Sequence, residues 1–119
     1  MARVTALVPD LLFGSRVQSM LEQAGHDVEL VSSEPDTWDH IAGTEVLIVD
    51  LTTDELDGIA LVETLKVGGE LPGARMLGFY SHVEQDVRVR AEEAGFDLVV
   101  PRSRMNREGA GLVARLAAG

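Results

Sequence analysis

The sequence predicts one doubly wound α/β domain, in which helices cover both faces of a parallel five-stranded sheet. Short apolar runs alternate along the chain with segments whose apolar residues recur at helical spacing. The central run, residues 45–49, ends in four consecutive apolar residues, which is typical of a strand buried on both faces. The connections are short and the chain has 119 residues, so we expect a single domain spanning residues 1–119.

Five apolar runs are predicted to be strands. The first ends at Pro9 and the last is stopped by Pro101, because proline cannot donate a hydrogen bond to a strand ladder. In the second run, Val28 and Leu30 alternate with charged residues, as in a strand. The predicted strands are residues 3–8, 27–31, 45–49, 74–79 and 97–100.

The segments between the strands are predicted to be helices, and a fifth helix closes the chain. Asp10 is placed to cap the first helix, and Gly25 ends it. Pro35 suits the first turn of the second helix, and Asn106 is the expected cap of the last one. The predicted helices are residues 13–24, 32–41, 56–67, 83–94 and 106–116.

Strict alternation of strands and helices implies right-handed crossovers and a flavodoxin-like sheet in the order 2-1-3-4-5. In such a sheet, ligands and chemistry gather at the carboxyl ends of the strands, beside the switch between the first and third strands. The segments expected at that edge are residues 9–10, 50–54, 80–82 and 101–104.

Composition excludes several classes of function. The net charge is −10, and residues 17–65 hold twelve acids and no Lys or Arg, so we expect no binding to nucleic acid. No apolar run is long enough to span a membrane, and the first residues do not form a secretory signal. We therefore expect a cytoplasmic location and no membrane contact. With no cysteine, the chain has neither disulfides nor thiolate sites.

No catalytic or cofactor motif is present. The chain lacks both GxGxxG and GxxxxGK[ST], so nothing indicates nucleotide binding. The three histidines lie in separate segments without the spacing of zinc ligands. We expect no enzyme activity and no bound cofactor.

Residues 46–66 read VLIVDLTTDELDGIALVETLK, and residues 92–103 read EEAGFDLVVPRS. These two segments resemble the receiver domains of response regulators, and in particular the chemotaxis-regulator type. The resemblance covers nearly the whole chain. It implies that Asp50 stands at the phosphoacceptor position and that Asp57 and Gly58 open the third helix.

The residues around Asp50 depart from the receiver pattern. Receivers hold Mg²⁺ with a pair of acids after the first strand, and those positions fall here on Val8 and Pro9. Asp10 comes one residue late. Because Mg²⁺ prefers several hard oxygen ligands, we expect no metal site, with a weak Mg²⁺ site at Asp10 and Asp50 as the open alternative.

The receiver's phosphoryl-sensing positions also differ. The Ser/Thr position falls on Tyr80, followed by Ser81, and the lysine position falls on Arg102. Arginine is a planar fork and not a point charge, so it is a poor substitute for lysine. The proline that follows this lysine in receivers falls on Ser103.

These departures predict a degenerate receiver-like module that works in signalling through protein contacts, without phosphorylation. In this hypothesis Asp50, Tyr80, Ser81 and Arg102 form a fixed polar cluster. Two alternatives stay open. One is a working receiver phosphorylated on Asp50, and the other is a small flavodoxin-like enzyme or ligand-binding domain.

The resemblance also implies a partner surface on the fourth helix, fifth strand and fifth helix. We expect a protein partner or a second copy of the chain to bind there. Tyr80 would anchor that surface if it turned outward. The candidate contact residues are Arg88, Arg90, Arg104 and Arg107.

Overall fold

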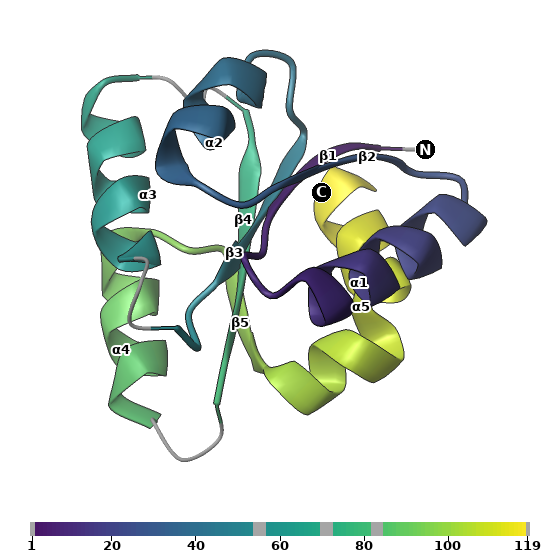
Figure 1. Cartoon of the computed structure of the whole chain (residues 1–119). Helices are drawn as coiled ribbons and strands as arrows, with labels where there is room; N and C mark the ends of the chain where they lie inside the picture. Colours follow the sequence, from purple (N-terminus) through teal and green to yellow (C-terminus); the bar gives the residue numbers. More distant parts are fainter. Residues whose placement is uncertain (1, 54–56, 70–72, 82–84, 119) are drawn as a thin grey trace.

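The computed structural model describes residues 2–53, 57–69, 73–81 and 85–118. Strands and helices alternate along this part of the chain (Figure 1). The strands are β1 (Arg3–Leu7), β2 (Asp27–Val31), β3 (Val46–Asp50), β4 (Arg75–Tyr80) and β5 (Leu98–Pro101). The helices are α1 (Leu11–Gln23), α2 (Glu34–His40), α3 (Gly58–Val67), α4 (Gln85–Ala94) and α5 (Arg102–Ala118).

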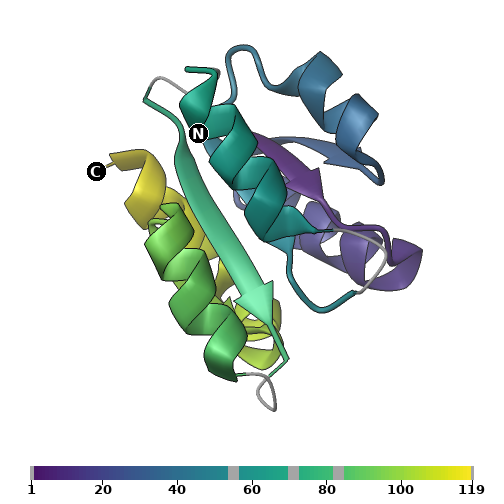
Figure 2. The ribbon, with the colours of Figure 1, turned by 90° about the vertical axis from the view of Figure 1, so that its left-hand side faces the viewer.

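All strand pairs are parallel, and their order is β2-β1-β3-β4-β5, as the sequence predicted. Helices α1 and α5 lie side by side on one face of the sheet, and α2, α3 and α4 cover the other (Figure 1). Figure 2 looks onto the second face, where α3 and α4 flank β4. The chain reverses its direction of winding between β1 and β3, which places the ends of these two strands at the edge where the site was expected.

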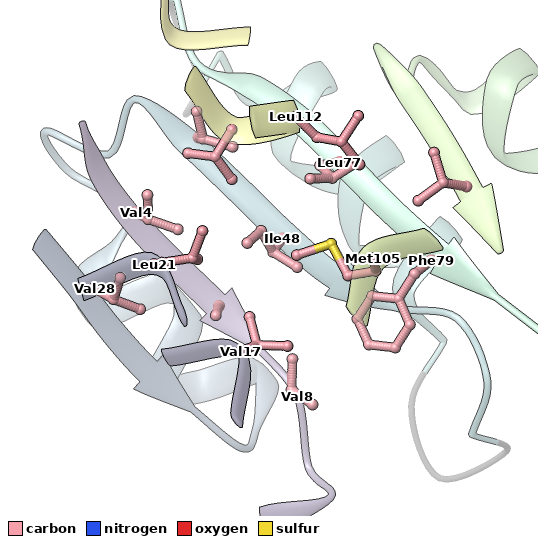
Figure 3. Close-up of a cluster of buried hydrophobic side chains, with 14 of the residues drawn as sticks. Val4, Val8, Val17, Leu21, Val28, Ile48, Leu77, Phe79, Met105 and Leu112 are labelled. Atoms are coloured by element: carbon pink, nitrogen blue, oxygen red, sulfur yellow. The ribbon is translucent and has the colours of Figure 1, made fainter. Parts of the chain in front are cut away.

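The sheet separates two apolar clusters because neighbouring side chains of a strand point to opposite faces. In β4, Leu77 and Phe79 pack under α1 and α5, whereas Met76 and Tyr80 pack under α3 and α4. Figure 3 shows the first cluster, in which side chains of α1 and α5 interleave with those of the central strands. All five residues of β3 are buried, as its apolar sequence predicted.

Helix ends follow the capping residues in the sequence. Asp10 caps α1 as predicted, Ser33 caps α2, and Asp57 caps α3 by accepting a hydrogen bond from the Ala60 N–H at 3.0 Å. The predicted first residue of the third helix, Leu56, and Val83 of the fourth lie outside the described residues. Across the described ranges, no helix has both the length and the apolar character needed to cross a membrane.

The start of α5 was predicted wrongly. The helix begins at Arg102, directly after β5, so Asn106 lies in its second turn and is not its cap. Residues 102–104 contain neither glycine nor proline, and Pro101 lies just before the first turn, so no residue in this stretch resists helical geometry. Met105 is fully buried under the sheet, and this burial stabilises the extra turn.

Candidate functional site

The candidate site lies at the carboxyl edge of the sheet and centres on Asp50, the last residue of β3. The side chain is buried, with the residue only 3% exposed. Its Oδ1 atom accepts two hydrogen bonds from Thr52, from the backbone N–H at 2.7 Å and from the hydroxyl at 2.6 Å. An aspartate that bonds the residue two positions later is a common turn former. The carboxylate is therefore covered by its own loop.

Asp10 is held by the helix that it caps. Its Oδ1 accepts hydrogen bonds from the N–H groups of Leu12 at 3.0 Å and Phe13 at 3.1 Å. Its Oδ2 lies 3.4 Å from Nη2 of Arg102. The bond from Phe13, supported by Leu12 and by the charge of Arg102, lowers the pKa of Asp10 below 3.8. Both carboxylate oxygens thus have partners on the α1 and α5 side.

Arg102 is fixed in place by an aromatic ring as well as by Asp10. Its guanidinium carbon lies 4.2 Å from the centre of the Phe13 ring, within the range of a cation–π contact. Phe13 in turn packs on Phe79, with ring centres 5.1 Å apart and planes tilted by 53°. This stack anchors Arg102 on the α1 side of the site.

Tyr80 does not face solvent, so the outward turn that would let it anchor the partner surface is not observed. The residue is 4% exposed and packs in the apolar cluster under α3 and α4. Its position follows from strand alternation, because Met76 is buried in the same cluster. Ser81, one residue later, is half-buried at the carboxyl edge. The predicted polar cluster is therefore divided: Tyr80 belongs to one side of the sheet and Arg102 to the other.

The residues at the receiver's metal-binding positions do not fit Mg²⁺. Val8 and Pro9 have no side-chain oxygen, and Val8 is fully buried in the core. Asp10 is already engaged by backbone N–H groups and by Arg102. Within the described ranges, no three His, Cys, Asp or Glu residues gather as a metal-ligating group. Within the part of the chain that the structure describes, Asp10 and Asp50 therefore belong to no group of three such ligands, and a weak site there stays a prediction.

The candidate partner arginines are largely paired within their own helices. Arg88 lies 3.5 Å from Glu92 in α4, and Arg104 lies 3.5 Å from Glu108 in α5. The Nε of Arg107 donates to the backbone oxygen of Ser103 at 3.4 Å. Arg90 lines a separate depression between α3 and α4, whose other charged lining residues are Asp57, Glu63 and Glu93. Arg90 is exposed and shares this depression with those three acids.

A cavity of about 560 Å³ opens between the start of α1, the start of α5 and the ends of β3 and β4. We call it the α1–α5 cavity. Phe13 and Pro101 supply its apolar wall. Its polar lining residues are Arg16, Thr52, Ser81, Arg102, Ser103 and Asn106.

The cavity unites residues that the sequence predicted with others that it did not. Ser81 and Arg102 were predicted, and they share this lining. Arg16 was not singled out, although it lies one helical turn after Phe13 and is the last basic residue before the long acidic stretch. Thr52 was expected at this edge within residues 50–54 but was not named as a site residue, although its spacing from Asp50 is that of an Asx-type turn.

Comparison with known proteins identifies the fold. No family model matches the sequence, and no curated protein matches it significantly. Solved structures do match. A Francisella response-regulator receiver domain superposes with a TM-score of 0.87 at 16% identity, over 99% of this chain and 98% of that one. The signal receiver domain of a histidine kinase from Syntrophus aciditrophicus gives 0.86 at 21%, over 100% and 92%.

A chemotaxis response regulator of Vibrio cholerae gives a TM-score of 0.83 at 15% identity, over 98% of each chain. The chain has the receiver fold. Asp50 ends β3, and in receivers the third strand carries the phosphoacceptor. Arg102 directly follows β5. The departures from the receiver pattern that the sequence predicted around Asp50 stay a prediction.

Proposed function

We propose that this chain is a receiver-like signalling module that acts through protein contacts and does not use phosphoryl transfer to Asp50. One observation carries the proposal. The carboxylate that comes nearest in sequence to the receiver's metal ligands, Asp10, is committed to the first turn of α1 and to Arg102. Asp50 is left with Thr52 as its hydrogen-bond donor among the described residues.

Electrostatics explain why this arrangement disfavours phosphorylation. Transfer of a phosphoryl group to a carboxylate brings two anions together, and a metal ion and a cation normally neutralise the developing charge. Here Val8 and Pro9 offer no metal ligand, and Arg102 is held against Phe13. The Thr52 hydroxyl donates a hydrogen bond to Oδ1 of Asp50, the carboxylate that would attack the phosphoryl group. The missing metal ligands, the fixed position of Arg102 and the bond from Thr52 would each raise the barrier for phosphoryl transfer to Asp50.

The proposed output is a contact with a protein partner or a second copy through α4, β5 and α5. β5 is an edge strand of the sheet, and α4 and α5 flank it on opposite faces. Val89 on α4 is 53% exposed and lies beside Arg88, so the surface combines an apolar group with a charged one. Such combinations are common in protein interfaces.

The test is a titration with Mg²⁺ followed by beryllofluoride, monitored by backbone amide NMR and Trp38 fluorescence. We expect no saturable change at Asp50 or Arg102 in the natural sequence. Asp50→Asn serves as the negative control. Pro9→Asp serves as the positive control, because it restores a carboxylate at a receiver metal position and should bring Mg²⁺-dependent shifts to Asp50. Saturable shifts in the natural chain that vanish in Asp50→Asn, or an acyl phosphate on Asp50 detected by mass spectrometry, would reject the proposal.

A further inference from the structure

The α1–α5 cavity carries two guanidinium groups and, along its described lining, no carboxylate. This is unusual in a chain with twenty acids and ten Lys and Arg residues. Arg102 forms an ion pair with Asp10. Arg16 is exposed and has no ion-pair partner among the described residues. The described lining of the cavity therefore carries two positive groups, one of them paired with the Asp10 carboxylate beside it.

The remaining lining adds hydrogen-bonding groups. Among the residues that the structure describes, the side chains of Ser81, Ser103 and Asn106 make no hydrogen bond, so they are available to a ligand. The first turn of α5 also lines the cavity. It follows Pro101, whose side chain has no oxygen to cap the free N–H groups of the helix. An anion at this end would satisfy those N–H groups and interact favourably with the helix dipole.

We propose that the α1–α5 cavity binds a small molecule carrying a phosphate group, without covalent attachment to the protein. The proposal rests on the proposed function, because it gives a receiver-like module without phosphoryl transfer a different chemical input. Guanidinium groups bind phosphate through short, charge-assisted hydrogen bonds. Arg102 is already positioned by Phe13 and Asp10, so little ordering is needed on binding.

The size of the cavity suits a small molecule. The cavity volume of about 560 Å³ lies within the range of about 300 to 1,000 Å³ that is typical of small-molecule sites. Phe13 and Pro101 provide an apolar wall for the body of such a molecule. The site is distinct from the phosphoacceptor. Thr52 lines the cavity, whereas Asp50 is not among the lining residues: it is 3% exposed and its carboxylate is bonded to Thr52.

The experiment titrates the whole chain with inorganic phosphate, adenosine 5′-monophosphate and adenosine at constant ionic strength, and follows backbone amide NMR shifts. We expect saturable shifts at Arg16, Ser81, Arg102 and Asn106 with the two phosphate probes, and none with adenosine. Tighter binding of the nucleotide identifies a phosphate ester as the ligand class, and tighter binding of inorganic phosphate identifies the free anion. Both results support an anion site. Absence of saturable shifts with both phosphate probes, or equal shifts with adenosine, overturns it.

Variants locate the site. Arg16→Gln removes a cation that has no described partner, so we expect binding to weaken about tenfold or more, as for the loss of a charged hydrogen bond. Arg115→Gln is the matched control, since it removes an arginine from the last turn of α5. Unchanged binding in Arg16→Gln, or equal weakening in Arg115→Gln, overturns the proposal. Thermal unfolding of each variant checks that the fold is kept.

Asp50→Asn separates this inference from the proposed function. A non-covalent anion site keeps its affinity in this variant and needs no Mg²⁺. If binding instead requires both Asp50 and Mg²⁺, the anion occupies the receiver's own phosphoacceptor site, and the inference is wrong. An acyl phosphate on Asp50 would reject the proposed function even if Arg16-dependent binding persisted.

Discussion

The hydrogen bond between the Thr52 hydroxyl and the Asp50 carboxylate makes a measurable contribution to stability. Thr52→Val removes the hydroxyl and keeps the side-chain shape, while the backbone N–H bond at 2.7 Å remains. A hydrogen bond to a charged group contributes about 1.5 to 3 kcal/mol. Thr52 is only half-buried, so water can replace part of the bond. We therefore expect a coupling energy of about 1 to 2 kcal/mol between the two side chains.

A double-mutant cycle measures this coupling. Urea denaturation, followed through the fluorescence of Trp38, the single tryptophan, is recorded for the natural chain, Thr52→Val, Asp50→Ala and the double variant. With a slope of about 1.5 kcal/mol per molar urea, Thr52→Val should lower the midpoint by roughly 1 M. The cavity left by Asp50→Ala cancels within the cycle. A coupling energy below about 0.3 kcal/mol would refute the reasoning, because Asp50 would then be free to react.

Three further predictions concern other parts of the fold. Gly58→Ala should lower the free energy of unfolding by about 1 to 3 kcal/mol, since its Cβ would overlap the Val49 side chain; an unchanged urea midpoint would contradict this. Gly111→Ala should raise it by about 0.5 to 1 kcal/mol, because the position is helical and open; a lower melting temperature would contradict it. Asp10→Ala should be less stable than the natural chain above pH 3.8, because the bond from Phe13 lowers the folded-state pKa. That difference should shrink as the pH falls below 3.8, and a difference that persists in acid would contradict the assignment.

Periodicity was enough to predict the sheet. Each strand was a short apolar run, and the order 2-1-3-4-5 followed from their alternation with helices. Capping chemistry is equally local, so Asp10 was predicted as the cap of α1 from its position alone. Both signals depend on residues close together in the sequence.

The errors came from features that depend on contacts across the fold. Residues 102–104 show no apolar periodicity, so the early start of α5 became apparent only once Met105 was seen buried under the sheet. The fourth strand was predicted to end at residue 79, so the alternation that buries Tyr80 with Met76 was not extended to it. The pairing of Asp10 with Arg102 joins residues 92 positions apart, and no local pattern predicts such a contact.

The direct passage from β5 into α5 has a mechanical consequence. No loop separates Pro101 from Arg102, so the chain lacks a flexible joint between the edge strand and the last helix. A helix of 17 residues at about 1.5 Å per residue is a rod about 25 Å long. A tilt of about 2° at Arg102 would displace the far end by about 1 Å. A small tilt at the candidate site would therefore become a larger displacement at the carboxyl end of α5.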